Sequence, residues 1–256
     1  MRQKQKAAVL SQRQTAPKIY DMWIETDLAG EAGPGQFICI YPKSESTLLP
    51  RPISICQVNE QKTAIRIVYR IAGKGTREFS SYKAGEEIFI LGPLGNGFPL
   101  QKGEGKRVLL MGGGIGIPPI LQLAQEIKGD KQIVLGYRDN HLFLKEDLEK
   151  LGAVQIATED GSVGVQGNVM DAVRQKGLEA DMIFACGPMP MLRAIKAYAQ
   201  EKNIPAYISL EEHMACGVGA CLGCVVKTKE IDHHSHVHNA RICTDGPVFE
   251  AEEVEI

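Results

Sequence analysis

The sequence predicts a mixed fold: an antiparallel β-domain, an α/β domain with a parallel sheet, and a small cysteine-rich module. Three observations predict it. Short apolar runs separated by Gly- and Pro-rich turns fill residues 1–101, strand-like and helix-like runs alternate over 102–210, and four cysteines gather within 211–256. Because 44% of the 256 residues are hydrophobic, the chain can bury the core of one large domain or two modest ones.

The first domain contains short runs with the apolar character of β-strands. The expected strands are Gln36–Tyr41, Ile53–Cys56, Ala64–Ile71 and Glu87–Leu91. A short helix is expected from Lys74 to Tyr82. Strands of this length between turn residues are typical of an antiparallel barrel or a sandwich.

The second domain alternates between strands and helices. The expected strands are Arg107–Met111, Gln132–Tyr137, Ala153–Ala157, Asp181–Cys186 and Ala206–Leu210. The expected helices are Pro118–Ile127, Phe143–Leu148, Val169–Val173 and Met189–Lys202. This alternation predicts a parallel sheet that is covered on both faces.

Two glycine turns of this domain follow predicted strands. The first holds Gly112, Gly113, Gly114 and Gly116 and opens a helix, where a nucleotide phosphate could approach the backbone. It does not fit the G-x-G-x-x-G pattern, so a tight turn without a ligand remains an alternative. The second turn holds Cys186, Gly187 and Pro188. Two turns at the carboxyl ends of parallel strands should face one crevice, which favours a nucleotide site.

The cysteines of the last module carry the most specific pattern. Cys216, Cys221 and Cys224 are spaced C-x4-C-x2-C, and Cys243 follows later. This spacing matches the plant-type run that binds a [2Fe-2S] cluster. A structural zinc ion is the first alternative, although only one pair has the C-x2-C spacing that zinc sites favour. Disulfides are the second alternative.

A histidine tract, His233–His238, lies between the third and fourth of these cysteines. Histidines replace two cysteines in Rieske clusters, and His-rich tracts can bind metal ions. Four cysteines already complete a ligand set, so we favour an exposed polar turn.

Composition limits the function classes. The net charge of −2 leaves no basic surface for nucleic acid, and no apolar run is long enough to span a membrane or to form a signal peptide. Seven cysteines without an export signal indicate a reducing compartment, so we expect a cytoplasmic protein.

The order of the motifs resembles the ferredoxin–NADP reductase superfamily. The resemblance rests on Arg51–Ser54, Gly75–Thr76, the two glycine turns and the cysteine run. Within the superfamily, the cysteine run is similar to that of the electron-transfer subunits of NAD-dependent (class 1B) dihydroorotate dehydrogenases. The resemblance implies an FAD-binding β-barrel at 1–101, an NAD-binding α/β domain at 102–210 and a [2Fe-2S] module at 211–256.

The resemblance also implies roles for single residues. Arg51 would pair with the FAD pyrophosphate, Ser54 would lie near flavin N5, and Gly75 and Thr76 would hold the pyrophosphate. The remaining flavin-lining positions would be Pro52, Ile53, Val68, Tyr69 and Arg70. The superfamily often has a tyrosine at the position of Ile53, so Tyr69 becomes the candidate for stacking on the flavin.

The two glycine turns would hold NAD, and an acidic group in Thr158–Ser162 would favour NADH over NADPH. Arg138 in a neighbouring loop argues the other way, because it could accept a 2′-phosphate. No catalytic acid or base is expected, since the protein supplies position and electrostatics to its cofactors.

The implied partner is an FMN-containing subunit that oxidises dihydroorotate in pyrimidine biosynthesis, assembled as a heterotetramer of two copies of each subunit. Electrons would pass from FMN through the cluster and FAD to NAD+. Two alternatives remain: a diaphorase-type subunit of a hydrogenase or sulfide dehydrogenase, and a non-enzymatic nucleotide-binding module with a structural zinc ion.

Overall fold

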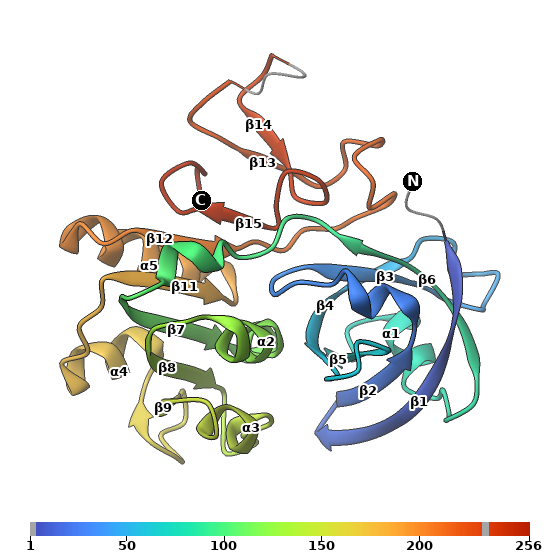
Figure 1. Cartoon of the computed structure of the whole chain (residues 1–256), viewed down its shortest axis with the longest axis horizontal. Coiled ribbons are helices and arrows are strands. Elements are labelled where there is room, and N and C mark those ends of the chain that lie inside the picture. The colour runs from blue at the N-terminus through green and yellow to red at the C-terminus, as the bar shows by residue number, and fades with distance from the viewer. Residues whose placement is uncertain (1–3, 232–235) are drawn as a thin grey trace.

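The computed structural model describes residues 4–231 and 236–256 and shows three connected parts (Figure 1). The N-terminal part is a closed barrel in the strand order β1-β2-β5-β4-β3-β6. Its strands are β1 (Gln5–Ala16), β2 (Ile19–Glu25), β3 (Phe37–Tyr41), β4 (Arg51–Val58), β5 (Ala64–Arg70) and β6 (Glu87–Leu94), with the helix α1 (Lys74–Phe79) after β5. The predicted β-domain is therefore confirmed as a barrel.

Two barrel strands were missed by the sequence reasoning. β1 and β2 form a long antiparallel pair, and β1 closes the barrel on β6. The run Gln12–Gln14 within β1 is polar, so apolar alternation is weak there. Only the closure of the sheet shows that this segment must be a strand.

The second part is a sheet in the order β10-β9-β8-β7-β11-β12-β15. The strands β7 (Arg107–Gly113), β8 (Asp130–Tyr137), β9 (Ala153–Thr158), β10 (Val165–Gln166), β11 (Met182–Cys186) and β12 (Ala206–Ser209) run parallel. The helices are α2 (Pro118–Glu126), α3 (Lys145–Glu149), α4 (Val169–Lys176) and α5 (Met189–Lys202). The predicted parallel sheet is confirmed.

Alternating side chains place two apolar cores on this sheet. Leu109 and Met111 of β7 belong to one core, with residues of α4 and α5, whereas Val108 and Leu110 belong to the other, with residues of α2 and α3. The second core also contains the barrel residue Val68. Helix α2 therefore packs between its own sheet and the barrel, and its side chains unite the two domains.

The C-terminal segment lies over the two domains (Figure 1). It carries the small antiparallel pair β13 (Val225–Lys227) and β14 (Asn239–Arg241). Its last strand, β15 (Val248–Glu250), adds to β12 as an antiparallel edge strand of the large sheet. The cysteine module is thus anchored in the α/β domain. Its last strand, β15, joins the sheet of the domain that was predicted to end at residue 210.

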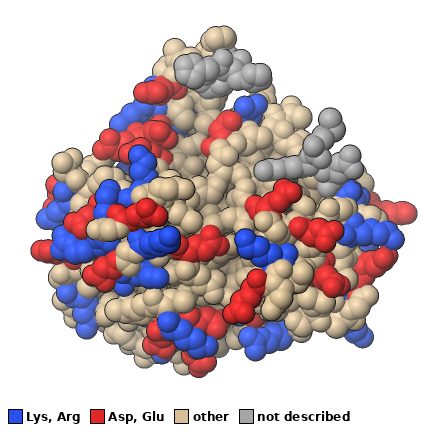
Figure 2. Space-filling view, in the orientation of Figure 1, with Lys and Arg blue, Asp and Glu red and all other residues tan. Residues whose placement is uncertain are grey.

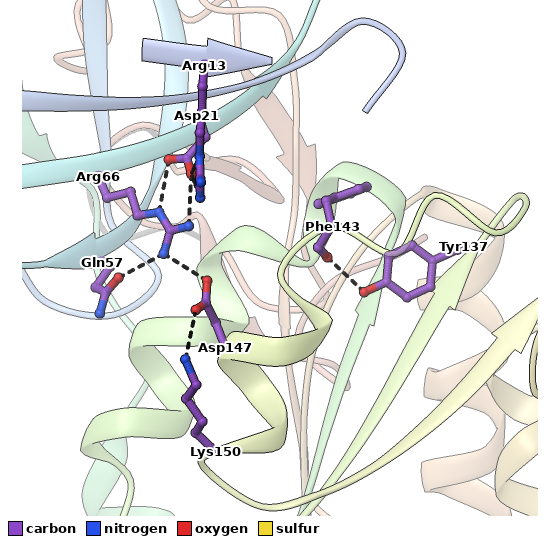
Figure 3. A network of polar contacts seen from close by, with 8 residues as sticks. All are labelled: Arg13, Asp21, Gln57, Arg66, Tyr137, Phe143, Asp147 and Lys150. Atoms are coloured by element: carbon purple, nitrogen blue, oxygen red, sulfur yellow. Dashed lines mark hydrogen bonds and ion pairs between the residues drawn. The ribbon is translucent and has the colours of Figure 1, made fainter. Parts of the chain in front are cut away.

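A polar network joins the barrel to α3 (Figure 3). The guanidinium of Arg66 donates to both carboxylate oxygens of Asp21 at 2.9 Å each, to Gln57 at 3.1 Å and to Asp147 of α3 at 3.0 Å. The side chains of Arg66 and Asp21 are only 8% and 3% exposed. Such a buried pair satisfies both ions by paired hydrogen bonds, which the planar guanidinium suits.

Acidic and basic side chains are interspersed over the face shown in Figure 2. In the part of the chain that the structure describes, no helix has both the length and the apolar character needed to cross a membrane.

We predict that Arg66→Met lowers the free energy of unfolding by about 3 kcal/mol, because the buried Asp21 carboxylate loses its buried partner and keeps the exposed Arg13 guanidinium, 3.2 Å away. Asp147→Asn is the matched change at the other end of the network, where the carboxylate is 35% exposed. We expect it to cost less than about 1 kcal/mol. Urea unfolding followed by circular dichroism measures both; equal costs would contradict this account.

Candidate functional site

The cysteine loop begins directly after the linker that follows β12. Cys216 and Cys221 lie in the loop, Cys224 ends it next to β13, and Cys243 follows β14. The Ile242 amide donates to the Cys224 carbonyl at 2.8 Å, so a backbone contact brings the late cysteine back to the loop. The structure therefore gathers all four predicted ligands in one place.

Neighbouring cysteines shift the pKa values of two of the four thiols. Burial tends to raise the pKa of Cys216, but hydrogen bonds from the Val218 and Cys221 backbone and from the Cys221 side chain lower it to about 7. Burial and the neighbouring Cys224 raise the pKa of Cys243 to about 12. These contacts link Cys216 with Cys221 and Cys224 with Cys243.

This pairing fits a two-iron cluster, in which each iron takes two protein thiolates. Backbone N–H groups already point at the sulfurs: Val218 donates to Cys216 Sγ at 3.4 Å, and Gly219 donates to Cys243 Sγ at 3.2 Å. Hydrogen bonds to sulfur are the contacts that set the potential of such clusters. Among the described residues no three His, Cys, Asp or Glu side chains converge on one ion position.

The loop rests on the outer wall of the barrel. Gly217 has a φ of +70°, and a Cβ there would lie 3.0 Å from Cys39 Sγ of β3. Cys39 is fully buried, and its apolar cluster also contains Cys224 and Cys243. Burial, with the charges of Cys243, Cys216 and Cys224, raises the pKa of Cys39 to about 12. Cys39 was predicted to be a buried core residue. It is buried, and it lies where the barrel contacts the cysteine loop.

The predicted flavin residues lie on the neighbouring barrel strands. In the antiparallel register, Ser54 is opposite Phe37 and Pro52 is opposite Cys39. Residues directly opposite each other point to the same face. Phe37 and Cys39 belong to the core outside the barrel, so Pro52 and Ser54 also point outward.

The structure places the side chains of two predicted flavin-lining residues inside the barrel. Tyr69 is 1% exposed and belongs to the barrel core, where its hydroxyl donates to Gln12 at 2.7 Å and its ring stacks on Tyr20 at 5.9 Å. Ile53 also packs against this core. Neither side chain can stack on a ring outside the barrel, because both point to its interior; only their backbone can line a ligand. Val68, by contrast, belongs to the outer core and Arg70 is exposed.

Arg51 lies against the start of α1. A Cβ on Gly75 would be 2.9 Å from Arg51 Nε, so the absence of a side chain at Gly75 lets the arginine approach the helix. Thr76 accepts hydrogen bonds from the Ala72 and Gly73 amides at 2.9 and 3.1 Å. Its hydroxyl therefore orders the turn, and the first-turn amides of α1 remain without partners inside the helix.

The two glycine turns are packed against each other. A Cβ on Gly116 would lie 2.4 Å from the Cys186 carbonyl oxygen, and one on Gly113 would lie 2.4 Å from Met191 Sδ of α5. Glycine at these positions lets the turns touch. Gly114 differs, because its φ is +52° and nothing lies within 4 Å of the Cβ position. Gly114 is therefore the residue at which the turn is open to a ligand.

The loops after β8 and β9 also lie together. The Asp160 amide donates to the Arg138 carbonyl at 3.3 Å, and Thr158 is buried, with its hydroxyl donating to the Val163 carbonyl at 2.8 Å. Thr158 thus shapes the turn, while Arg138 and Asp160 stand at its surface. The structure thus brings together Arg138, which could favour NADPH, and the acidic loop, which could favour NADH.

Sequence reasoning missed Glu211 and Ser209, which follow the end of β12. The Glu211 side chain is exposed to solvent, yet the surrounding protein raises the pKa of its carboxyl, against the opposing charge of Arg70. Burial raises the pKa of Cys186, as does the charge of Glu211, while a hydrogen bond from Ser209 lowers it. Glu211 therefore lies near Arg70 of the barrel and near Cys186 of the second glycine turn. The position of Glu211, an acidic residue just after the carboxyl end of a predicted strand, was the sequence signal that could have identified it.

The histidine tract is described only in part, since His233 and His234 lie outside the described residues. His236 is exposed, and His238 Nδ1 donates to the Lys229 carbonyl at 3.0 Å. Both observations fit an exposed polar turn.

Comparison with known proteins decides the family. A protein of Caldanaerobacter subterraneus subsp. tengcongensis named dihydroorotate dehydrogenase B (NAD(+)), electron transfer subunit, is 45% identical over 255 residues, covering 99% of both chains. A Bacillus cereus protein of the same name is 42% identical over 261 residues, again covering 99% of both. This chain belongs to the family of dihydroorotate dehydrogenase B electron transfer subunits. The predicted family is confirmed.

Residues 211–255 match the iron–sulfur cluster binding domain of dihydroorotate dehydrogenase B. Among solved structures, the NADH-dependent reduced ferredoxin–NADP oxidoreductase, studied for flavin-based electron bifurcation, has a TM-score of 0.86 at 29% identity and covers 97% of this chain and 89% of that one. A Neisseria gonorrhoeae ferredoxin–NADP+ reductase shares the fold, with a TM-score of 0.67 at 16% identity and coverage of 77% and 91%. The predicted cofactors, FAD, [2Fe-2S] and NAD, are confirmed.

We predict that Gly75→Ala lowers the FAD content of the purified protein, because the new methyl group would displace the Arg51 guanidinium. Gly73→Ala is the matched control two residues earlier, where nothing lies within 4 Å of the Cβ position. Flavin absorbance per chain measures both variants. Full FAD content in Gly75→Ala would contradict the placement of Arg51.

We also predict that Gly217→Ala lowers the iron content. The substitution combines an unfavourable positive φ, worth about 1–2 kcal/mol, with a contact against Cys39 Sγ. Gly177→Ala tests the φ effect alone, since its φ is +59° and its Cβ position is open. Iron and acid-labile sulfide per chain should fall only in Gly217→Ala; an equal loss in both variants would show that general instability is the cause.

Proposed function

We propose that this chain relays electrons between NAD(H) and an FMN-containing subunit that oxidises dihydroorotate, as part of pyrimidine biosynthesis. One observation carries the proposal. The paired cysteines, the outward-facing flavin positions of β4 and the two glycine turns belong to three parts of one chain that pack against each other. FAD, when bound, supplies the exchange between a hydride pair and single electrons.

Different residues bind the different parts of FAD and NAD. Arg51 and the first-turn amides of α1 offer positive charge and N–H donors for the FAD pyrophosphate. The outward positions of Pro52, Ser54, Val68 and Arg70 line the flavin, with backbone contributions at Ile53 and Tyr69. Gly114 admits NAD at the first turn, and the second turn, Cys186–Pro188, closes the other side. No acid or base side chain is assigned.

The cysteines hold the [2Fe-2S] cluster, with Cys216 and Cys221 on one iron and Cys224 and Cys243 on the other. The domain division follows the same assignment: FAD in 1–101, NAD in 102–210 and the cluster in 211–256, with β15 tying the last to the second. We favour NADH over NADPH, because an acidic group in the Thr158–Ser162 loop would repel a 2′-phosphate. The unpaired thiols support a cytoplasmic location.

The catalytic partner docks on the cysteine loop. Val218, Leu222 and Val225 are 47%, 59% and 40% exposed, and they stand among the cysteines. Exposed apolar groups of this kind mark interaction sites. We propose the heterotetramer of two copies of each subunit as the assembly.

The proposal is tested with Cys221→Ser. Visible absorption of the purified variant should lack the iron–sulfur bands and retain FAD that NADH still reduces. Loss of FAD reduction with intact cluster bands would overturn the assigned order of cofactors.

A second measurement tests the partner. Purification of the native complex should yield an FMN subunit, and the complex should oxidise NADH in an orotate-dependent reaction. A hydrogenase or sulfide dehydrogenase partner would instead support a diaphorase-type role.

A further inference from the structure

Two neighbouring strands of the barrel connect the cysteine loop to the proposed flavin site. Strands β3 and β4 pair antiparallel, with Phe37 opposite Ser54 and Cys39 opposite Pro52. In each pair, the β3 residue packs in the core that contains the cluster cysteines, and the β4 residue belongs to the flavin-lining set. Opposite residues of an antiparallel pair have Cβ atoms about 4.5–5.5 Å apart. A single pair of neighbouring strands therefore separates the core around the cluster cysteines from the flavin-lining residues.

Cys39 makes the contact on the side of the cysteines. Its Sγ lies 3.0 Å from the Cβ position of Gly217, the residue that follows the ligand Cys216. A larger residue at 217 would push the loop away from the barrel. Cys39 is 0% exposed and Phe37 is 3% exposed, so water is excluded from this layer.

Apolar neighbours complete the layer. Leu91 and Leu94 of β6 are buried in the same core as Phe37 and Cys39, and Leu94 Cδ1 lies 3.3 Å from the Gly217 Cβ position. Close-packed interiors leave few voids. Packed side chains thus fill the layer between the cysteine loop and β4.

We propose that Cys39 and Phe37 form the link through which single electrons pass between the flavin strand and the cluster loop. This proposal rests on the proposed function and names the residues that set the rate of its internal step. With FAD and the cluster bound, that step would move one electron between the reduced flavin and a ferric ion of the cluster, and no bond between heavy atoms would form or break. Cys39 and Phe37 act as positioning residues, because they hold the two sites together and keep water out.

The test compares Cys39→Ala with Cys56→Ala in the full-length chain carrying FAD and cluster. Both cysteines are fully buried strand residues outside the barrel interior, but Cys56 lies in the core shared with α2, away from the cysteine loop. Stopped-flow absorption after mixing with NADH follows FAD reduction and cluster reduction separately. We expect Cys39→Ala to slow cluster reduction about tenfold, the size of effect that changes beside metal ligands often have. FAD reduction by NADH should be unchanged in both variants.

Three further measurements separate a link from a structural role. Iron content and the electron paramagnetic resonance spectrum of the reduced cluster should match those of the unsubstituted protein. The midpoint potential of the cluster should also stay the same, since a changed potential would explain a slower rate by driving force and overturn the proposal. Cluster reduction at the original rate in Cys39→Ala would overturn it as well.

Phe37→Leu keeps the test decisive if Cys39→Ala loses iron. Phe37 lies opposite Ser54 and is two residues from Cys39, so its change leaves the contact with Gly217 intact. Slower cluster reduction with full iron content in this variant supports the link, and an unchanged rate overturns it. If the unsubstituted protein showed no cluster reduction by NADH, the proposed function itself would be wrong.

Discussion

The contact between the cysteine loop and the barrel wall is the constraint on which the rest of the structure depends. A relay of single electrons needs its redox groups close together across dry protein. Gly217 makes this possible, because a residue without a side chain can lie against Cys39. The same wall presents Pro52 and Ser54 on the adjacent strand. A change in this contact would alter the distance between two cofactor sites without touching either.

The chain uses its C-terminal segment to hold that contact in place. After the cysteines, β15 returns to the large sheet and pairs with β12. The loop is therefore fixed at both ends: one end leaves the α/β domain and the other rejoins it. On the opposite side, the barrel is joined to the α/β domain by the packing of α2 and by the hydrogen bonds of Arg66. These contacts fix the barrel against the α/β domain.

Sequence reasoning named candidate site residues whose chemistry depends on spacing along the chain. The cysteines and the glycine turns are of this kind, because a loop ligand or a tight turn is a local property. Tyr69 and Ile53 were assigned to the flavin, but their side chains point into the barrel. Alternation along a strand defines two faces without saying which one is interior. Glu211 was missed because its surroundings come from β5 and β11, which are distant in sequence.

The sequence by itself determined the kind of chemistry: thiolates at cluster spacing, glycines at strand ends and a motif order that belongs to one family. These features are local, so no long-range contact is needed to recognise them. Tertiary structure alone decided that Cys243 returns to the cysteine loop and that this loop lies against β3. It also decided which side chains of β4 and β5 point toward a ligand. Closure of the barrel sets these faces, because β1 must pair with both β2 and β6 before interior and exterior are defined.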